Sequence, residues 1–125
     1  MNGDYILLDT NAFIYFFEGR PGIAEHILLA ETIYYSVITE IELLSAPHLS
    51  KDDIAAIREF LARCQRVDLT PDIAERTILI RRIDRIKTPD AIIAATALTL
   101  NVPLITADKQ FTRITGLKVV SDILE

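Results

Sequence analysis

Four acidic residues stand where an apolar segment of this sequence ends or where a helical pattern begins. They are Asp9, Glu42, Asp90 and Asp108. In open parallel sheets, ligands bind beyond the carboxyl ends of the strands, so we expect side chains at such places to converge although they are distant in sequence. Converging carboxylates repel and desolvate one another unless cations or protons neutralise them. Oxygen ligands suit Mg²⁺ or Mn²⁺, and two such ions position a water molecule for attack on a phosphodiester.

Each of these acids, taken alone, also fits a purely structural role at a helix start. Asp9 and Asp108 occupy places where capping carboxylates are favoured, and Asp90 lies in a first helical turn behind a proline, where negative charge meets the positive end of the helix dipole. Thr39 and Glu42 match the capping-box pattern, so Glu42 has a local explanation as well. The functional hypothesis therefore depends on the coincidence of all four acids.

Two polar residues accompany the aspartates. Asn11 and Thr106 each stand two residues from an aspartate, and both are candidates to orient metal ligands or water. Asn and Thr also favour turns for local reasons, so ordinary turn chemistry is the alternative role for both.

Short apolar or β-branched runs alternate with helical patterns along the chain. Strands are predicted over residues 5–8, 32–37, 67–69, 103–106 and 117–120. Helices are predicted over residues 12–19, 23–30, 39–46, 52–64, 72–86 and 89–101, which places Glu42 in the first turn of its helix. Strands that alternate with helices predict a parallel α/β sheet with helices on both faces. Residues 91–98 are apolar nearly all round their helix, so we expect that helix to be buried against the sheet.

Length and composition predict a single domain without a membrane segment. The chain has 125 residues, 50% of them hydrophobic, which suits one core over residues 1–125 and leaves too little length for two. The first residues have no basic segment and only a brief Ile-Leu-Leu run, so we expect a cytoplasmic protein with neither a signal peptide nor a membrane span. The single cysteine, Cys64, supplies no intramolecular disulfide or zinc cluster and is expected to be a packed, inert thiol.

The net charge of −5, from 13 basic and 18 acidic residues, has the wrong sign for binding nucleic acid through bulk electrostatics. A nuclease would need bound cations or a basic stripe to meet the phosphates. Residues 76–87 provide such a stripe, made of Arg76, Arg81, Arg82, Arg85 and Lys87. On one long helix Arg81 and Arg85 share a face with Arg82 beside them, and these three are our candidates for RNA binding. The apolar residues of the segment, Leu79, Ile83 and Ile86, are expected to pack inward. A solvated face with salt bridges is the alternative role for the arginines.

Four short motifs follow one another along the chain. They are Leu-Leu-Asp-Thr-Asn at residues 7–11, Thr-x-x-Glu-Leu at 39–43, Pro-Asp-x-x-Ile-Ala-Ala-x-Ala at 89–97 and Thr-x-Asp at 106–108. In this order they resemble the PIN domain family, and most of all the VapC-type toxins of bacterial and archaeal toxin–antitoxin operons, from residue 7 to residue 120. The resemblance implies an α/β/α sandwich around a central, mainly parallel sheet of four to five strands. It also implies a homodimeric, metal-dependent ribonuclease that a small antitoxin inhibits by placing its tail in the acidic site. The Mg²⁺ or Mn²⁺ ligands that it implies are Asp9, Glu42, Asp90 and Asp108.

Three alternatives stay open at this point. A shifted helix would present Glu40 in place of Glu42, although the leucine after Glu42 keeps the family register. A haloacid-dehalogenase-like phosphatase would also use an aspartate such as Asp9 at the end of its first strand, but it would carry a second aspartate where Asn11 stands. A catalytically silent binding module with the same fold would act through protein contacts, and the presence of all four acids argues against it.

Overall fold

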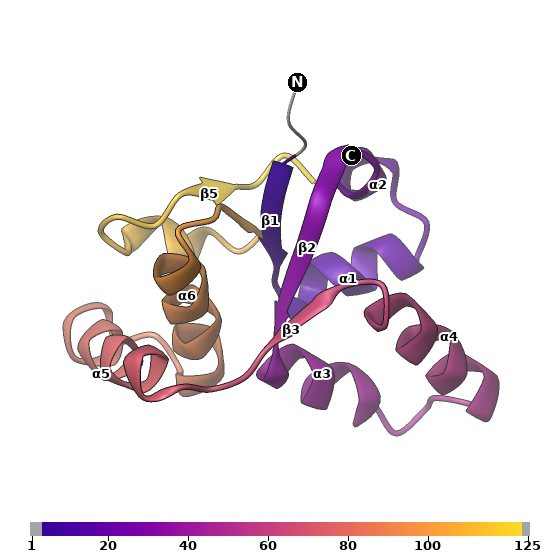
Figure 1. Cartoon of the computed structure of the whole chain (residues 1–125), viewed down its shortest axis with the longest axis horizontal. Helices are drawn as coiled ribbons and strands as arrows, with labels where there is room; N and C mark the ends of the chain where they lie inside the picture. The colour runs from indigo at the N-terminus through magenta and orange to yellow at the C-terminus, as the bar shows by residue number, and fades with distance from the viewer. Residues whose placement is uncertain (1–3, 124–125) are drawn as a thin grey trace.

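Five short strands form a parallel sheet at the centre of the computed structural model, which describes residues 4–123 (Figure 1). The strands are β1 (Asp4–Leu8), β2 (Ala30–Ser36), β3 (Gln65–Val67), β4 (Leu104–Ile105) and β5 (Val119–Val120). Their order is β3-β2-β1-β4-β5, so β1 is central and pairs with β2 and β4. Each predicted strand has a counterpart in the sheet, although β3 begins two residues before its predicted start, and every strand pair is parallel as expected.

Helices connect the strands and cover both faces of the sheet. In the described residues they are α1 (Thr10–Phe17), α2 (Pro21–Leu29), α3 (Val37–Leu44), α4 (Lys51–Leu61), α5 (Pro71–Asp84), α6 (Thr88–Leu100) and the 3₁₀ helix η1 (Lys109–Arg113). Helices α5 and α6 share one half of the core with Leu7 of β1, whereas α1, α2 and α4 share the other half with Ile6 and Leu8 (Figure 1). Successive side chains of a strand point to opposite faces, which is why neighbouring residues of β1 join different halves. The predicted α/β/α sandwich is confirmed.

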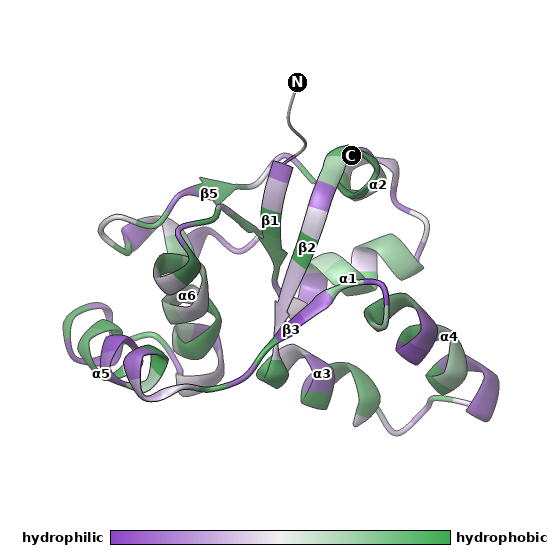
Figure 2. Ribbon diagram, viewed as in Figure 1, coloured by the Kyte–Doolittle hydropathy of each residue, from purple (hydrophilic) through white to green (hydrophobic). Residues whose placement is uncertain are grey.

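The buried helix that the sequence predicted is α6. All of its residues from 91 to 97 are buried, and hydrophobic residues run along both α6 and β1 (Figure 2). The one buried polar side chain of this stretch, Thr96, donates its hydroxyl to the Ile92 carbonyl at 2.7 Å and so needs no partner outside the helix. Asn101 ends the helix in the left-handed conformation, with φ 56°. This packing fixes the place of Asp90, in the first turn.

Helix α3 begins earlier than predicted. Ser36 ends β2 and caps the helix by accepting a hydrogen bond from the Ile38 N–H, so the helix starts at Val37 rather than at residue 39. Thr39 is buried inside the helix, so the alternative role of Thr39 and Glu42 as a capping box does not apply. Glu42 lies in the second helical turn. The physical reason is that Ser36, the last residue of the strand, itself supplies the capping oxygen, so no turn separates β2 from α3.

Helix α5 has a different buried face from the one predicted. Its buried residues are Ile73, Thr77 and Ile80, which recur at the spacing of one helical face. Leu79 and Ile83 are 56% and 76% exposed, so their expected inward packing was wrong. Ile86 is buried as expected, but it lies past the end of the helix at Asp84. The stripe that faces α6 sets the rotation of the helix, and the remaining apolar residues face outward.

The described residues contain neither a candidate membrane span nor an activated thiol. Within residues 4–123, no helix has the length and hydropathy needed to cross a membrane. Cys64 is half-buried just past α4, its thiol donates to the Phe60 carbonyl at 3.5 Å, and burial raises the pKa of the thiol to about 11. The nucleophilic thiolate is therefore scarce at neutral pH, as expected for a packed cysteine.

Candidate functional site

Two of the candidate acids, Asp9 and Asp108, lie beyond the carboxyl ends of β1 and β4, which are neighbours in the sheet. Leu8 of β1 pairs with Ile105 of β4, and the next residues along each strand are Asp9 and Thr106. The Asp9 N–H donates to the Ile105 carbonyl at 3.3 Å, which extends the contact between the two strands by one residue. Parallel pairing therefore brings Asp9 to the segment that carries Thr106 and Asp108.

Asp9 is the most enclosed of the four acids, with 4% of its surface exposed. Its Oδ1 accepts from the Ala12 N–H at 2.8 Å and caps α1, and its Oδ2 accepts a short hydrogen bond from the Thr106 hydroxyl. Burial raises the pKa of Asp9 to about 6, against the lowering effect of these two hydrogen bonds, and the negative charges of Asp90 and Asp108 raise it further. Asp9 therefore caps α1, yet its buried surroundings disfavour the negative charge of its carboxylate.

Thr106 connects Asp9 to the start of η1. Its fully buried hydroxyl donates to Asp9 and accepts from the Asp108 N–H at 3.0 Å. The position suits the orienting role predicted for this threonine. Asn11 is exposed in the first turn of α1, and its orienting role stays a prediction.

Asp90 and Asp108 share a partner that the sequence analysis missed. The side-chain Nε2 of Gln110 donates to Asp108 Oδ2 at 2.7 Å and to Asp90 Oδ2 at 3.1 Å. Burial raises the pKa of Asp90; the hydrogen bond from Gln110 lowers it, and the charges of Asp108 and Glu42 raise it. Asp108 also caps η1, because its Oδ1 accepts from the Gln110 N–H at 3.1 Å. In the sequence, the only indication of this contact was the amide side chain of Gln110, two residues after the capping Asp108.

Glu42, rather than Glu40, faces the other acids. The Thr10 hydroxyl, one residue after Asp9, donates to Glu42 Oε1 at 2.6 Å and lies 3.1 Å from the Thr39 hydroxyl. Glu40 instead accepts from Arg66 of β3 at 3.3 Å. Thr10 is a second contact that the sequence analysis missed. It ties α3 to the end of β1 and directs the Glu42 carboxylate toward the site.

Lys87 is a nearby positive charge that lowers the pKa of Asp90, but within the described part of the chain it forms no ion pair with that residue. Within residues 4–123, none of the four acids forms an ion pair with a lysine, arginine or histidine. In the same residues, the side chains as they lie form no group of three or more His, Cys, Asp or Glu ligands around one ion position. The donors are nevertheless all oxygens, and burial of two of the carboxylates leaves negative charge that a hard divalent cation would neutralise. The chemistry of the donor set therefore fits Mg²⁺ or Mn²⁺.

The three candidate arginines lie on the surface where α5 meets α6. Arg81 Nε donates to the Ile86 carbonyl at 3.3 Å, Arg82 is exposed, and Arg85 adopts the left-handed conformation with φ 58°. Since α5 ends before Arg85, the expected shared helix face of Arg81 and Arg85 was wrong. The alternative of a salt-bridged face is not formed either, because these arginines pair with no acid in residues 4–123.

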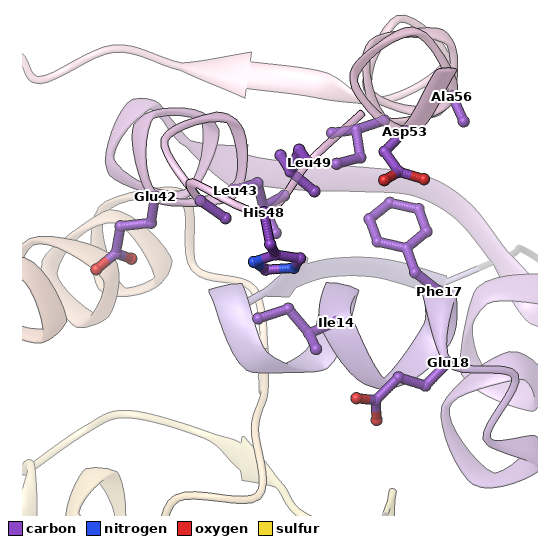
Figure 3. A pocket seen from close by; sticks show the side chains of 11 residues that line it. Ile14, Phe17, Glu18, Glu42, Leu43, His48, Leu49, Asp53 and Ala56 are labelled. Carbon is purple, nitrogen blue, oxygen red and sulfur yellow. The ribbon is translucent and has the colours of Figure 1, made fainter. Parts of the chain in front are cut away.

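A groove of about 480 Å³ adjoins Glu42 between α1, α3 and the start of α4 (Figure 3). Its floor is largely apolar and includes Ile14 and Phe17 of α1 and Leu43 of α3. Acidic side chains also line it, namely Glu18, Glu42 and Asp53. A segment with apolar and basic side chains would complement this groove.

Comparisons with known proteins agree with this geometry. The family model of the PIN domain matches residues 6–117. The structure superposes on a toxin–antitoxin complex from Klebsiella pneumoniae with a TM-score of 0.81 and 32% identity, covering 94% of this chain and 97% of the other. VapBC-1 from nontypeable Haemophilus influenzae gives a TM-score of 0.82 at 30% identity, with the same two coverages. VapBC2 from Rickettsia felis, bound to a DNA fragment from its promoter, gives 0.82 at 25% identity and covers 93% of this chain and 97% of the other.

A sequence comparison with curated proteins gives no significant match. The family model nonetheless spans nearly the whole chain, from β1 to the segment that precedes β5, and includes all four candidate acids. The fold, the motif order and this match agree, and the chain belongs to the PIN domain family.

Proposed function

We propose that this chain is a single PIN domain that acts as the VapC-like toxin of a toxin–antitoxin pair, an endoribonuclease that hydrolyses RNA phosphodiester bonds with Mg²⁺ or Mn²⁺. The observation that carries the proposal is the buried Asp9 carboxylate, on which the charges of Asp90 and Asp108 act and which forms no ion pair in residues 4–123. The likeness to VapBC and toxin–antitoxin complexes supports the biological role.

Four carboxylates would hold the metal, namely those of Asp9, Glu42, Asp90 and Asp108. When bound, a divalent cation supplies a Lewis acid and a water molecule of lowered pKa. The chain itself orients the ligands: Ala12 N–H and Thr106 hold Asp9, and Thr10 holds Glu42. The exposed arginines at the end of α5 would meet RNA phosphates, since that end leads directly into the turn that carries Asp90.

The chemistry of Asp9 favours this role over the phosphatase alternative. Both of its carboxylate oxygens accept hydrogen bonds, and the residue is almost fully enclosed. Attack on phosphorus also needs room for a phosphoryl group against one Asp9 oxygen, whereas a metal ligand needs room only for the ion. Asn11, which replaces the second aspartate of such phosphatases, is exposed.

The partners that we propose are a small antitoxin and a second copy of the chain. The groove beside Glu42, with its apolar floor and acidic residues, suits an antitoxin tail that carries apolar and basic side chains. Exposed apolar residues on α5 support self-association into a homodimer.

The decisive experiment compares wild-type protein with Asp9→Asn and Asp90→Asn. Both variants keep the side-chain shape but lose ligand charge, so we expect folding by circular dichroism to be retained and RNA cleavage with Mn²⁺ or Mg²⁺ to fall at least a hundredfold. Calorimetric titration should show metal binding to wild type and much weaker binding to each variant. Asp52→Asn, which changes an exposed aspartate in the first turn of α4, is the matched control and should cleave RNA normally.

Three results would reject the proposal. If Asp9→Asn cleaved RNA as fast as wild type, the acids would be explained as helix caps alone. Metal binding without RNA cleavage would favour a silent binding module, and hydrolysis of a phosphomonoester in its place would favour a phosphatase.

A further inference from the structure

The side chain of Gln110 bridges two of the proposed metal ligands. Its Nε2 lies 2.7 Å from Asp108 Oδ2 and 3.1 Å from Asp90 Oδ2, so the amide group donates to both carboxylates. Its main-chain N–H holds the other oxygen of Asp108 at 3.1 Å. The buried Phe111, the next residue of η1, anchors this turn in the core beside α6. We call this arrangement the Gln110 bridge.

The bridge partly takes the place of a cation between two like charges. An amide N–H₂ group carries partial positive charge, and it sits against the oxygens of two acids that have no ion-pair partner in residues 4–123. A glutamine is uncharged, so it compensates the repulsion without neutralising either carboxylate.

We propose that Gln110 is a positioning residue that sets the threshold for metal binding: its amide holds Asp90 and Asp108 in the metal-free protein, and a divalent cation binds only when the amide releases at least one of them. This inference rests on the metal-dependent function proposed above. Cation and amide compete for the same carboxylates. A divalent ion compensates the loss of one or both of these hydrogen bonds more readily than Na⁺ or K⁺ does, so the bridge also selects against monovalent ions.

The test measures metal binding and metal-free stability of the full chain with Gln110→Ala and Gln110→Glu. Calorimetric titration with MnCl₂ and MgCl₂ should give about tenfold tighter binding for Gln110→Ala, since the competing hydrogen bonds to charged groups are gone. Without metal, the melting temperature of this variant should lie below that of wild type. Gln110→Glu should show the same two changes more strongly, because it adds a carboxylate. Thr112→Ala, which removes another side-chain hydrogen bond of η1, is the matched control and should bind metal as wild type does.

A second measurement uses only the wild-type chain. The side-chain amide resonances of Gln110 should shift on saturation with Mg²⁺, whereas those of the exposed Gln65 on β3 should not. Two results would overturn the proposed role of the bridge. One is a metal affinity of Gln110→Ala that is equal to or weaker than that of wild type, and the other is Gln110 amide resonances that do not shift when Mg²⁺ is added. If that happens while wild type binds metal and cleaves RNA, the proposed function stands and only the bridge fails. If no form binds either metal, the metal site fails and the bridge with it.

Discussion

At the scale of single residues, Asp9 meets two requirements that oppose each other. Capping α1 needs an acceptor oxygen, while enclosure disfavours the charge on that oxygen. Asparagine caps helices about as well as aspartate does, so the cap alone does not explain a buried carboxylate. A buried carboxylate such as that of Asp9 lowers the stability of the fold and is not required for capping, so we expect it where a charged ligand is needed.

The cost should appear as a pH dependence of the metal-free protein. Because burial raises the pKa of Asp9 to about 6, the folded chain holds a proton that the unfolded chain has released between its ordinary pKa and that value. The stabilisation is thus fully present below about pH 4 and is lost as pH rises through about 6, by an amount on the order of 2–3 kcal/mol. Asp90, whose pKa burial also raises, acts in the same direction. Urea unfolding in the presence of a chelator, repeated from pH 4 to 8, measures the change.

Two variants separate Asp9 from other titrating groups. Asp9→Asn should flatten the pH dependence and melt above wild type at pH 7.5. Asp53 is the opposite case, because hydrogen bonds from Ser50 lower its pKa. Its contribution is present at neutral pH and lost as pH falls, so Asp53→Asn should destabilise at pH 7.5. A pH profile of Asp9→Asn that matches wild type would show that the Asp9 carboxyl is not the buried acid responsible.

At the scale of elements, the three arginines at the end of α5 differ in their conformations and contacts. Arg81 holds the turn into α6 through the Ile86 carbonyl, and Arg85 ends the helix in a conformation that glycine adopts without strain. Arg82 is exposed in the last turn and has no protein partner among the described ion pairs. Loss of RNA binding by an Arg81 variant would therefore mix two effects, whereas Arg82 and Arg85 allow a cleaner test.

We expect Arg82→Ala and Arg85→Gly to weaken RNA binding across sequences. Each lost phosphate contact should reduce the slope of log affinity against log salt concentration by about 0.7 for single-stranded RNA. Arg85→Gly should also raise the free energy of unfolding by about 0.5–1 kcal/mol, because it relieves a left-handed arginine. Arg63→Ala, on the far side of the sheet beyond α4, is the control. Filter binding at several salt concentrations gives the slopes, and equal slopes for all four proteins would rule out this surface.

At the scale of the whole molecule, apolar side chains are left on the surface in a way that a monomer does not explain. Ile78, Leu79 and Ile83 of α5 are all at least half exposed. They lie on a helix whose other face is already packed against α6, so they do not contribute to the core of a single chain. A second copy of the chain would cover this surface.

The expected result is a dimer in solution that Ile83→Glu converts to a monomer. A buried glutamate without a partner is costly at an interface, so the variant should dissociate into monomers. Each monomer should stay folded and show a cooperative melting curve. Leu28→Glu is the control, since Leu28 of α2 is 83% exposed on the opposite half of the fold. Light scattering at several concentrations measures the mass. A wild-type protein that stays monomeric at high concentration would contradict the homodimer.

The sequence by itself determined the alternation of strands and helices, the burial of α6 and the order of the family motifs. These features depend on hydrophobic periodicity and on turn residues, which are local properties of the chain. Only the tertiary structure decided which side chains meet. Thr106 and Asp9 are 97 residues apart, Thr10 and Glu42 are 32 apart, and Gln110 and Asp90 are 20 apart.

The same limit explains the exposed Leu79 and Ile83. Periodicity identifies residues that are able to face a core, but the surface against which a helix packs selects the face that is buried.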